Sequence, residues 1–212
     1  MASAQRRVLI TAGPTREPLD PVRFISNASS GRQGVALAEE ALARGYAVDL
    51  VYGPMEASPP NGARAVPVTT AAEMMAACRN LHPTCDVLIG AAAVSDFRPR
   101  ASSARKHKRD GAPWIIELVP NEDILATLSR EKGRRVHAGF ALETENLIAN
   151  ALRKLRSKGL DWLVANSPEA IGASSSRYVL LGADGTQREI GITTKRELAK
   201  TLLDALESGL PT

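Results

Sequence analysis

The stretch RVLITAGPTREPLDPVRFISNASSGRQG, residues 7–34, decides the fold, because it joins a buried strand to a helix through a long polar loop. Residues 7–12 form a short apolar run rich in β-branched side chains, which is typical of a buried strand. From residue 32 onward, apolar residues recur at helical spacing until Gly45 provides a stop signal. This order of elements predicts the first unit of an α/β sheet.

The rest of the chain alternates between strand and helix patterns. We expect further strands at residues 47–52, 64–68, 86–94, 114–118, 135–140 and 161–165, and helices at 71–80, after Asn121 as the cap, at 145–158 and at 194–207. This alternation predicts a Rossmann-like, doubly wound, mostly parallel sheet with right-handed crossovers. Residues 178–181 and 187–190 flank Asp184-Gly185, a type I′ turn signal, which predicts a C-terminal antiparallel β-hairpin extension at one edge.

Length and composition indicate one soluble domain. A chain of 212 residues supports a single core, so we expect residues 1–212 to form one domain. The hydrophobic fraction is 44%, and no apolar run approaches the eighteen or so residues needed to cross a bilayer. Residues 1–7 lead into the first strand without the apolar segment of a signal peptide. We therefore expect a cytoplasmic protein without a membrane partner.

The few cysteines and histidines do not suggest metal chemistry. Cys78 and Cys85 are spaced unlike any metal or redox motif, and a disulfide is not expected in the cytoplasm. The histidines, His82, His107 and His137, are scattered along the chain. The sequence thus predicts reduced structural thiols and no metal site built by the protein.

A strongly basic segment follows the predicted strand 86–94. Residues 98–109 read RPRASSARKHKR, with six Lys or Arg residues and no acid. Most such runs are solvated loops, and a nucleic-acid patch would be expected to interleave aromatic residues for stacking. A third interpretation is a flexible basic flap at about residues 98–113, which closes over a polyphosphate.

The predicted topology also places the functional site. In doubly wound sheets, ligands bind beyond the carboxyl ends of the strands, near the point where strand order reverses. That rule selects four loops at one rim of the sheet, namely Gly13-Pro14, Ala91–Asp96, Gly139–Glu143 and the loop at Asn166.

The start of the first helix partly matches a dinucleotide fingerprint. Ser29-x-Gly31-x-x-Gly34 would let a phosphate approach the backbone at Gly31 and let the helix pack closely on the sheet at Gly34. An NAD site is disfavoured for two reasons. The fingerprint does not follow the first strand directly, and the second strand ends in Tyr52-Gly53 where a ribose-binding acid is expected.

The intervening loop carries polar side chains able to reach a ligand. An Arg such as Arg16 or Arg23 can grip a carboxylate or phosphate through two parallel hydrogen bonds, and the Asn27 amide can hold a carboxylate oxygen. The alternative interpretation is structural: Arg23 pairs with Asp20 or Glu17, and Asn27 caps the turn. Local pattern leaves both open.

Several motifs together resemble one enzyme family. ITAGPTREPLDPVRFISNASSGRQG, AAAVSDFRP, RKHKR, PNEDILATL, GFALET and KGLDWLVAN follow, in order and spacing, the motifs of the synthetase half of bacterial coenzyme A biosynthesis bifunctional flavoproteins. That family is phosphopantothenoylcysteine synthetase, also called phosphopantothenate–cysteine ligase. The resemblance extends from about Val8 to the last helix.

The resemblance implies a two-step ligation. The carboxylate of 4′-phosphopantothenate attacks the α-phosphate of CTP (ATP being less expected), with Mg²⁺, and pyrophosphate leaves an acyl-cytidylate. The amine of L-cysteine then attacks this mixed anhydride and releases CMP. The first step needs negative charge neutralised, and the second needs an amine held beside an activated carbonyl with water excluded.

The resemblance also implies roles for particular residues. Asn27 falls on the family's catalytic Asn, which holds the acyl-cytidylate, Arg23 on an Arg tied to the second step, and Lys106 on the catalytic flap Lys that reaches the triphosphate. Lys108 and Arg109 are supporting charges. The implied nucleotide-binding positions are Ser30, Gly31, Gly90, Ala91, Ala92, Asp96, Lys106, Asn121, Asp123, Ile124, Phe140, Lys154 and Lys158.

The chain departs from the family pattern at a few positions. Ser167 replaces an Asp after the predicted strand 161–165, which puts the role of that position in doubt. Glu122 replaces a Pro at a helix start, where an acid is favourable, and His107 varies the flap. Synthetases of this family form homodimers, and the edge hairpin at residues 178–190 is a candidate surface. They are often fused to a decarboxylase domain, of which we find nothing in this sequence, so both a stand-alone ligase and a fragment of a longer chain stay open, with the decarboxylase as a separate partner or a fused domain.

Two other functions compete with the ligase. A nucleotide-binding relative that lost ligation remains open because of Ser167. An NAD(P)-dependent Rossmann oxidoreductase would need a catalytic Tyr/Lys or His and a ribose-binding acid, and neither is well placed. A nucleic-acid partner is not expected.

Overall fold

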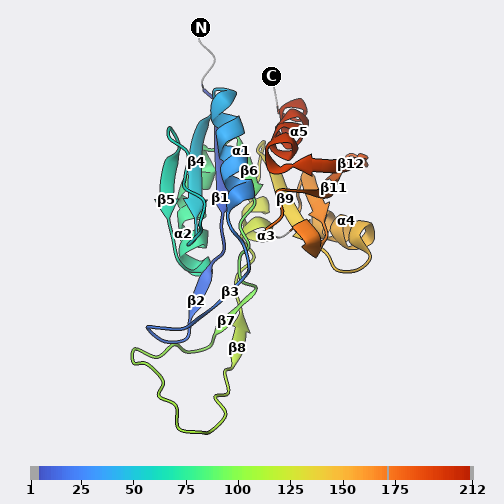
Figure 1. Cartoon of the computed structure of the whole chain (residues 1–212). Coiled ribbons are helices and arrows are strands. Elements are labelled where there is room, and N and C mark those ends of the chain that lie inside the picture. The colour runs from blue at the N-terminus through green and yellow to red at the C-terminus, as the bar shows by residue number, and fades with distance from the viewer. Residues whose placement is uncertain (1–4, 171, 211–212) are drawn as a thin grey trace.

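The computed structural model describes residues 5–170 and 172–210, and within them it has the predicted mostly parallel α/β architecture (Figure 1). One eight-stranded sheet has the order β12-β11-β10-β9-β6-β1-β4-β5. Its strands are β1 (Arg7–Ala12), β4 (Ala47–Tyr52), β5 (Arg64–Pro67), β6 (Val87–Gly90), β9 (Val136–Leu142), β10 (Trp162–Asn166), β11 (Ser175–Gly182) and β12 (Gln187–Thr194). All neighbours from β5 to β10 are parallel, whereas β11 and β12 form the antiparallel extension expected at the edge.

Helices cover both faces of the sheet, as the continuous burial of its central strands requires. Val8 and Ile10 of β1 belong to the core beneath α1 (Arg32–Ala43) and α5 (Lys195–Ser208). Leu9 points the other way, into the core beneath α2 (Ala71–Leu81) and α3 (Ile124–Ser129). On that second face, α4 (Leu147–Ser157) covers β9, β10 and β11. A strand that is apolar on both faces is the expected pattern for a parallel sheet enclosed by helices.

The entry into α1 depends on two glycines, of which the sequence predicted the packing role of Gly34. A Cβ built on Gly34 would lie 2.4 Å from the Ala12 Cβ, so the absence of a side chain lets α1 pack directly against β1. Gly31 has a φ of 76° and precedes the first helical residue, and a Cβ there would lie 2.2 Å from the Met55 sulfur. Both positions therefore exclude any other residue without local rearrangement.

Two long connections leave the body of the molecule and form a projecting arm (Figure 1). We define the arm as residues 16–26 and 97–120; it contains β2 (Arg16–Pro18), β3 (Phe24–Ser26), β7 (Phe97–Pro99) and β8 (Leu118–Pro120). β2 pairs with β3 and β7 with β8, both antiparallel, as two small separate sheets. The sequence predicted a plain loop for the first segment and a strand at 114–118 for the second, and the second prediction was wrong because pairing begins only at Leu118.

Two further local predictions need correction. Asp123, not Asn121, is the N-cap of α3, since its carboxylate accepts a hydrogen bond from the Ala126 amide at 3.0 Å. The hairpin turn is not type I′, which needs a positive φ at both central residues. Within the described residues only Gly185 of the Asp184-Gly185 pair has a positive φ, and the Asp184 carboxylate instead accepts from the Thr186 amide at 2.8 Å.

Two buried histidines, His82 and His137, meet edge to face beneath α3. The Nε2 atoms of His82 and His137 are 3.0 Å apart, and the Ser129 hydroxyl lies 2.9 Å from the His137 Nδ1. The side chains are almost fully inaccessible, so burial is the largest cause that lowers the pKa of both rings. Neighbouring His82, Lys132 and Arg135 add to the effect at His137, whose pKa falls to about 3. Both rings are neutral in the folded protein at neutral pH.

We predict that this pair makes the protein acid-sensitive. The unfolded chain protonates a histidine near its ordinary pKa of 6.5, whereas folded His137 stays neutral until about pH 3. The stabilisation is therefore complete above pH 6.5 and is lost as pH falls through that window, by about 1.4 kcal/mol per pH unit for one such group. Urea unfolding at pH 7.5, 6.0 and 5.0 measures this slope. His137→Gln, which cannot titrate, should have a shallower slope, and an unchanged slope would contradict the assignment.

Candidate functional site

A cavity of about 540 Å³ opens at the carboxyl ends of β1, β6, β9 and β10. The chain runs from β1 outward to β4 and β5, then returns to β6 on the other side of β1, so the strand order reverses between β1 and β6. The cavity lies at this reversal, where the sequence predicted a ligand site. Its wall also includes the start of α1, the residues before α3, and one face of α4.

Most of the residues implied by the resemblance line this one cavity. They are Asn27, Ser30, Gly31, Gly90, Ala91, Ala92, Asp96, Asn121, Asp123, Ile124, Phe140, Lys154 and Lys158. The exceptions are four residues of the arm that do not line the cavity of their own chain: Arg23, Lys106, Lys108 and Arg109. Within the described residues, four cations (Arg32, Lys154, Lys158 and Lys195) and three carboxylates (Asp96, Glu122 and Asp123) face the cavity. The cations exceed the carboxylates by one, so the cavity wall offers both positive and negative groups to a ligand.

Asn27 is tied to the rim of the cavity. Its Nδ2 lies 3.1 Å from the carbonyl oxygens of both Ala93 and Val94 and donates to them. Two acceptors on one side fix the amide orientation, and no donor among the described residues contacts the Oδ1. Asn27 thus offers an acceptor rather than a donor, which corrects the expectation that it grips a carboxylate oxygen.

The turn after β6 extends the sheet into the rim. Pro14 pairs with Ala93 in a parallel bridge, and the Ala93 amide donates to the Gly13 carbonyl at 2.9 Å. The Thr15 hydroxyl accepts from the Ser95 amide at 2.9 Å. The loop after β1 and the turn after β6 are therefore one hydrogen-bonded unit, which holds Asn27 beside them.

Residues 90–92 of this turn are small for more than one reason. We expected residues 90–92 to be short so that a base or ribose could reach the backbone. At Gly90, however, a built Cβ would lie 2.6 Å from the Leu125 Cδ1. A larger residue here would have to displace the Leu125 side chain, so packing of α3 against β6 favours a small residue even without a ligand. Ala91 and Ala92 keep the ligand interpretation, since both line the cavity.

On the opposite wall, two lysines form ion pairs with carboxylates: Lys154 within α4, and Lys158, which caps the C-terminus of that helix. The Lys158 Nζ lies 3.0 Å from Asp123, and the Lys154 Nζ lies 2.8 Å from Glu143. Asp123 thus caps α3 and fixes a cavity lysine at the same time. The Lys154 and Lys158 side chains remain 41% and 30% exposed, so a ligand can still reach them.

Asn121 and Asp96 both line the cavity but have different roles, since Asn121 is hydrogen-bonded within the protein and Asp96 is exposed. The Asn121 amide nitrogen donates to the Ser95 carbonyl at 2.8 Å, and its oxygen accepts from Arg98 at 3.0 Å. Asn121 therefore joins the turn after β6 to the residues before α3, which is a structural role. Among the described residues no cation lies within 4.0 Å of the exposed Asp96 carboxylate, which leaves it available to a ligand.

Gln33 and Lys195 are among the cavity residues that escaped the sequence reasoning. The Gln33 Nε2 donates to the Lys195 carbonyl at 3.2 Å, while its buried Oε1 has no partner in the described residues. Burial chiefly, and then Arg32, lowers the pKa of Lys195. Lys195 stands in the first turn of α5, where the helix dipole disfavours a cation. A lysine in the first turn of a predicted helix was the sequence signal that could have revealed Lys195 as a cavity residue.

Ser167 and Asn166 follow β10 at the far end of the cavity. Asn166 lines the cavity, as the rim rule predicted, but Ser167 does not. The Ser167 hydroxyl lies 3.5 Å from Glu169, a long contact within its own turn.

Metal and membrane features can be stated for the described residues alone. In residues 5–170 and 172–210, no group of three or more His, Cys, Asp or Glu side chains is arranged to hold a metal ion. No helix in these ranges combines the length and the apolar character that crossing a membrane requires.

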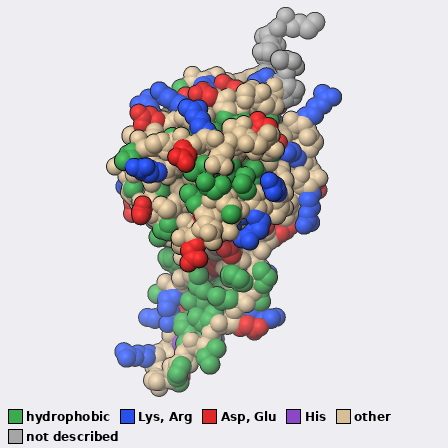
Figure 2. All heavy atoms as spheres, turned by 90° about the vertical axis from the view of Figure 1, so that its right-hand side faces the viewer, with side chains coloured by type: hydrophobic (Ala, Val, Ile, Leu, Met, Phe, Trp, Pro, Cys, Tyr) green, Lys and Arg blue, Asp and Glu red, His purple; other side chains and the backbone are tan. Residues whose placement is uncertain are grey.

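The arm carries an exposed apolar surface (Figure 2). Its large exposed hydrophobic residues are Val22, Phe24, Phe97, Trp114, Ile115 and Leu118, with Ile115 90% exposed. Elsewhere in the described chain only Leu142 and Ile192 are comparably exposed. A patch concentrated in this way on a projecting element usually marks an interaction surface.

Comparison with known proteins places the chain in a family. Residues 3–210 match the family described as DNA/pantothenate metabolism flavoprotein C-terminal domain. The coenzyme A biosynthesis bifunctional protein CoaBC of Bacillus subtilis (strain 168) is 38% identical over 206 residues, which cover 95% of this chain and 51% of that protein. A cysteine/cysteine sulfinic acid decarboxylase from an unknown prokaryotic organism is 43% identical over 204 residues, covering 93% of this chain and 57% of the relative.

The fold agrees with this assignment. A crystal structure of the C-terminal domain of a CoaBC protein superimposes with a TM-score of 0.84 at 37% identity, covering 96% of this chain and 94% of that one. The chain spans about half the length of the curated relatives it matches. It belongs to the DNA/pantothenate metabolism flavoprotein C-terminal domain family, that of the phosphopantothenoylcysteine synthetase domain which its motifs resemble.

Proposed function

We propose that this chain is a phosphopantothenate–cysteine ligase that joins 4′-phosphopantothenate to L-cysteine through an acyl-cytidylate. The observation that supports this most is the convergence of Asn27 and twelve of the thirteen implied nucleotide-binding residues on one cavity. These residues come from five separate stretches of sequence, so their meeting is not a consequence of proximity in the chain. The preference for CTP over ATP follows from the family resemblance.

In the first step, the carboxylate of phosphopantothenate attacks the α-phosphate and pyrophosphate departs. Negative charge accumulates on the leaving group, and the four cavity cations together with the free amides at the start of α1 stabilise it. Lys106 supplies a further cation from the flap. Each cation acts more strongly in a partly enclosed cavity than it would in water.

In the second step, the amine of cysteine attacks the activated carbonyl and CMP departs. The free Asn27 Oδ1 is suited to accept a hydrogen bond from that amine and aim its lone pair at the carbonyl. Arg23, 39% exposed on the arm, supplies a cation for the developing charge.

Mg²⁺ fits this site as a companion of the nucleotide. The described residues contain no three-carboxylate cage, but Asp96 stands free at the cavity. Mg²⁺ commonly binds through one or two carboxylates plus substrate phosphates and waters. When bound, it would neutralise phosphate charge, with Asp96 as its protein ligand.

A pyrophosphate-release assay tests the proposal. The protein is incubated with 4′-phosphopantothenate, Mg²⁺ and each nucleoside triphosphate in turn, with and without cysteine. The ligase releases pyrophosphate only when phosphopantothenate is present, fastest with CTP, and turns over only when cysteine is added. Tight CTP binding without pyrophosphate release would instead support the nucleotide-binding relative. Release with ATP alone would overturn the nucleotide assignment.

We also propose that the functional unit is a homodimer formed through the arm. The two arm residues tied to catalysis, Arg23 and Lys106, stand outside the cavity of their own chain. A second copy covering the apolar arm surface would bring an arm beside a neighbouring cavity and remove that surface from water. The edge hairpin at residues 178–190, our first candidate from the sequence, exposes no large hydrophobic residue, and the nearest one is Ile192 further along β12. A decarboxylase, fused or separate, is a further proposed partner.

Ile115→Glu should dissociate this dimer. Ile115 is 90% exposed within the chain, so the substitution leaves the protomer's core intact but places a charge in the proposed interface. We expect the variant to sediment as a monomer, with a dissociation constant raised at least about 100-fold. Ile192→Glu on the hairpin is the matched control and should remain dimeric. Dissociation by the control alone would move the interface to the hairpin.

A further inference from the structure

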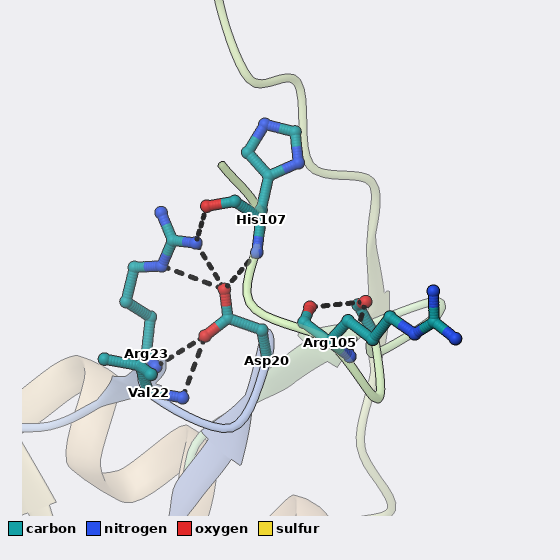
Figure 3. Close-up of polar contacts among 6 residues, drawn as sticks. Asp20, Val22, Arg23, Arg105 and His107 are labelled. Carbon is teal, nitrogen blue, oxygen red and sulfur yellow. Dashed lines mark hydrogen bonds and ion pairs between the residues drawn. The ribbon is translucent and has the colours of Figure 1, made fainter. Parts of the chain in front are cut away.

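One carboxylate in the arm gathers donors from two distant parts of the chain (Figure 3). The Asp20 side chain is fully buried in the turn between β2 and β3. Its Oδ1 accepts from the amides of Val22 and Arg23, each at 2.9 Å. Its Oδ2 accepts from the Arg23 Nε at 3.0 Å, from the Arg23 Nη2, and from the His107 amide at 3.2 Å. The two oxygens thus have separate tasks, one within the turn and one beyond it.

The Asp20 Oδ2 connects the basic flap to the turn between β2 and β3, because it accepts from the His107 amide. The His107 carbonyl accepts from the Arg23 Nη2 at 2.8 Å, so Asp20 and Arg23 bind both polar atoms of the residue 107 backbone. The Ser103 amide adds a bond to the Leu19 carbonyl at 2.9 Å. We call Asp20, Arg23, His107 and Trp114 the latch. It joins segments that lie 84 or more residues apart in the sequence.

Aromatic contacts close the latch on its other side. The Arg23 guanidinium carbon lies 4.4 Å from the centroid of the Trp114 ring, a cation–π distance. The His107 and Trp114 rings stack with centroids 4.4 Å apart and planes 12° from parallel. Trp114, the residue that follows the flap, therefore contacts both Arg23 and His107. The flap predicted to be flexible is anchored at residue 107.

The latch fixes the backbone beside Lys106 without using its side chain. Within residues 5–170 and 172–210, no carboxylate lies within 4.0 Å of the Lys106 Nζ. The adjoining Arg105, Lys108 and Arg109 repel Lys106 and one another, so an untethered flap would spread. A held backbone keeps these charges together, ready for a polyphosphate.

We propose that Asp20 is a positioning residue for the reaction: it holds the flap through residue 107 and so presents Lys106 to the nucleotide. This inference rests on the proposed ligase function only for the role of Lys106; the latch itself is independent of it. The hydrogen bonds from Arg23 are the largest cause that keeps the pKa of Asp20 well below its usual range. The latch therefore stays charged, and closed, across the neutral pH range.

Asp20→Asn separates the two tasks of this side chain. The amide keeps an oxygen for the Val22 and Arg23 amides, so the turn survives. Its NH₂ group replaces the Oδ2 and cannot accept from Arg23 or His107, so the latch opens. Asp110→Asn is the matched control, because Asp110 lies in the same flap and accepts only from the nearby Ala112 amide.

The experiment compares both variants with the parent protein in three measurements. Trypsin cleavage in the flap, at Arg105 to Arg109, should be about tenfold faster in Asp20→Asn and unchanged in the control. Trp114 fluorescence, read in a Trp162→Phe background, should change in intensity for Asp20→Asn alone. The rate of pyrophosphate release at saturating CTP should fall roughly tenfold while the KM for CTP stays within about twofold, since the cavity residues bind the nucleotide.

Each outcome decides a different point. Parent-like cleavage and fluorescence in Asp20→Asn would overturn the latch. Faster cleavage with an unchanged rate of pyrophosphate release would overturn the positioning role. If the parent protein released no pyrophosphate, the proposed function would fail, yet the first two measurements would still test the latch. Should Asp20→Asn not fold, Trp114→Leu, which leaves the Asp20 turn intact, should show the same faster cleavage.

Discussion

Lys106→Gln is expected to slow the release of pyrophosphate by about 100-fold or more, without changing the fold. The Lys106 side chain is exposed and lies within 4.0 Å of no carboxylate in the described residues, so its loss removes no structural contact. Glutamine keeps much of the length and a donor but not the charge. The loss should fall on the activation step, because negative charge on the leaving pyrophosphate is what the ammonium group would stabilise.

Single-turnover measurement with CTP and phosphopantothenate, in the absence of cysteine, isolates that step. The matched control is Arg105→Gln, which removes a neighbouring positive charge from the same flap and should change the rate by less than about threefold. Equal losses in the two variants would mean that the flap acts through its summed charge. A normal rate in Lys106→Gln would refute its assignment.

Asn27→Asp is expected to stop the reaction half-way. The substitution replaces an amide that donates to the Ala93 and Val94 carbonyls with a carboxylate that cannot donate and is repelled by both. The side chain must turn away from the rim, and the acceptor offered to the cysteine amine is lost from its place. The cavity cations are untouched, so activation should continue.

We therefore expect a burst of about one pyrophosphate per site, followed by turnover at least about 100-fold below the parent, with acyl-cytidylate accumulating. Rapid quench and chromatography detect that intermediate. Asn80→Asp, an exposed change of the same chemistry on α2, should leave both phases unaltered. Full turnover in Asn27→Asp would show that this side chain is not needed for the second step.

The sequence was informative wherever local pattern and global topology agree. β1 and β4 were predicted with their observed bounds because each is a compact apolar run between clear turn residues. The place of the cavity followed from the alternation of strands and helices, because ligands bind beyond the carboxyl ends of parallel strands. The small residue at position 34 agrees with the close packing of α1 on β1. These features depend on apolar runs, turn residues and a glycine, which can all be identified in a single sequence.

Other features depend on partners that are distant in the chain. β2, β3, β7 and β8 are three residues long each, too short to show a period. The sequence left Arg23 to pair with Asp20 or Glu17, and it gave no sign of His107, which comes from another excursion of the chain. Asn121 and Asp123 are both good capping residues, and only the observed hydrogen bond to the Ala126 amide decides between them.

The continuity between arm and sheet limits how this domain could be shortened. The bridge between Pro14 and Ala93 makes the root of the arm a prolongation of the two central strands. A minimal version lacking residues 16–26 and 97–120 would keep every strand of the main sheet and the contacts of Asn27 with Ala93 and Val94, yet it would lose Arg23, Lys106 and the whole latch. The proposed catalytic residues of the arm and the proposed dimer surface thus lie in the same two excursions, so neither can be removed without the other.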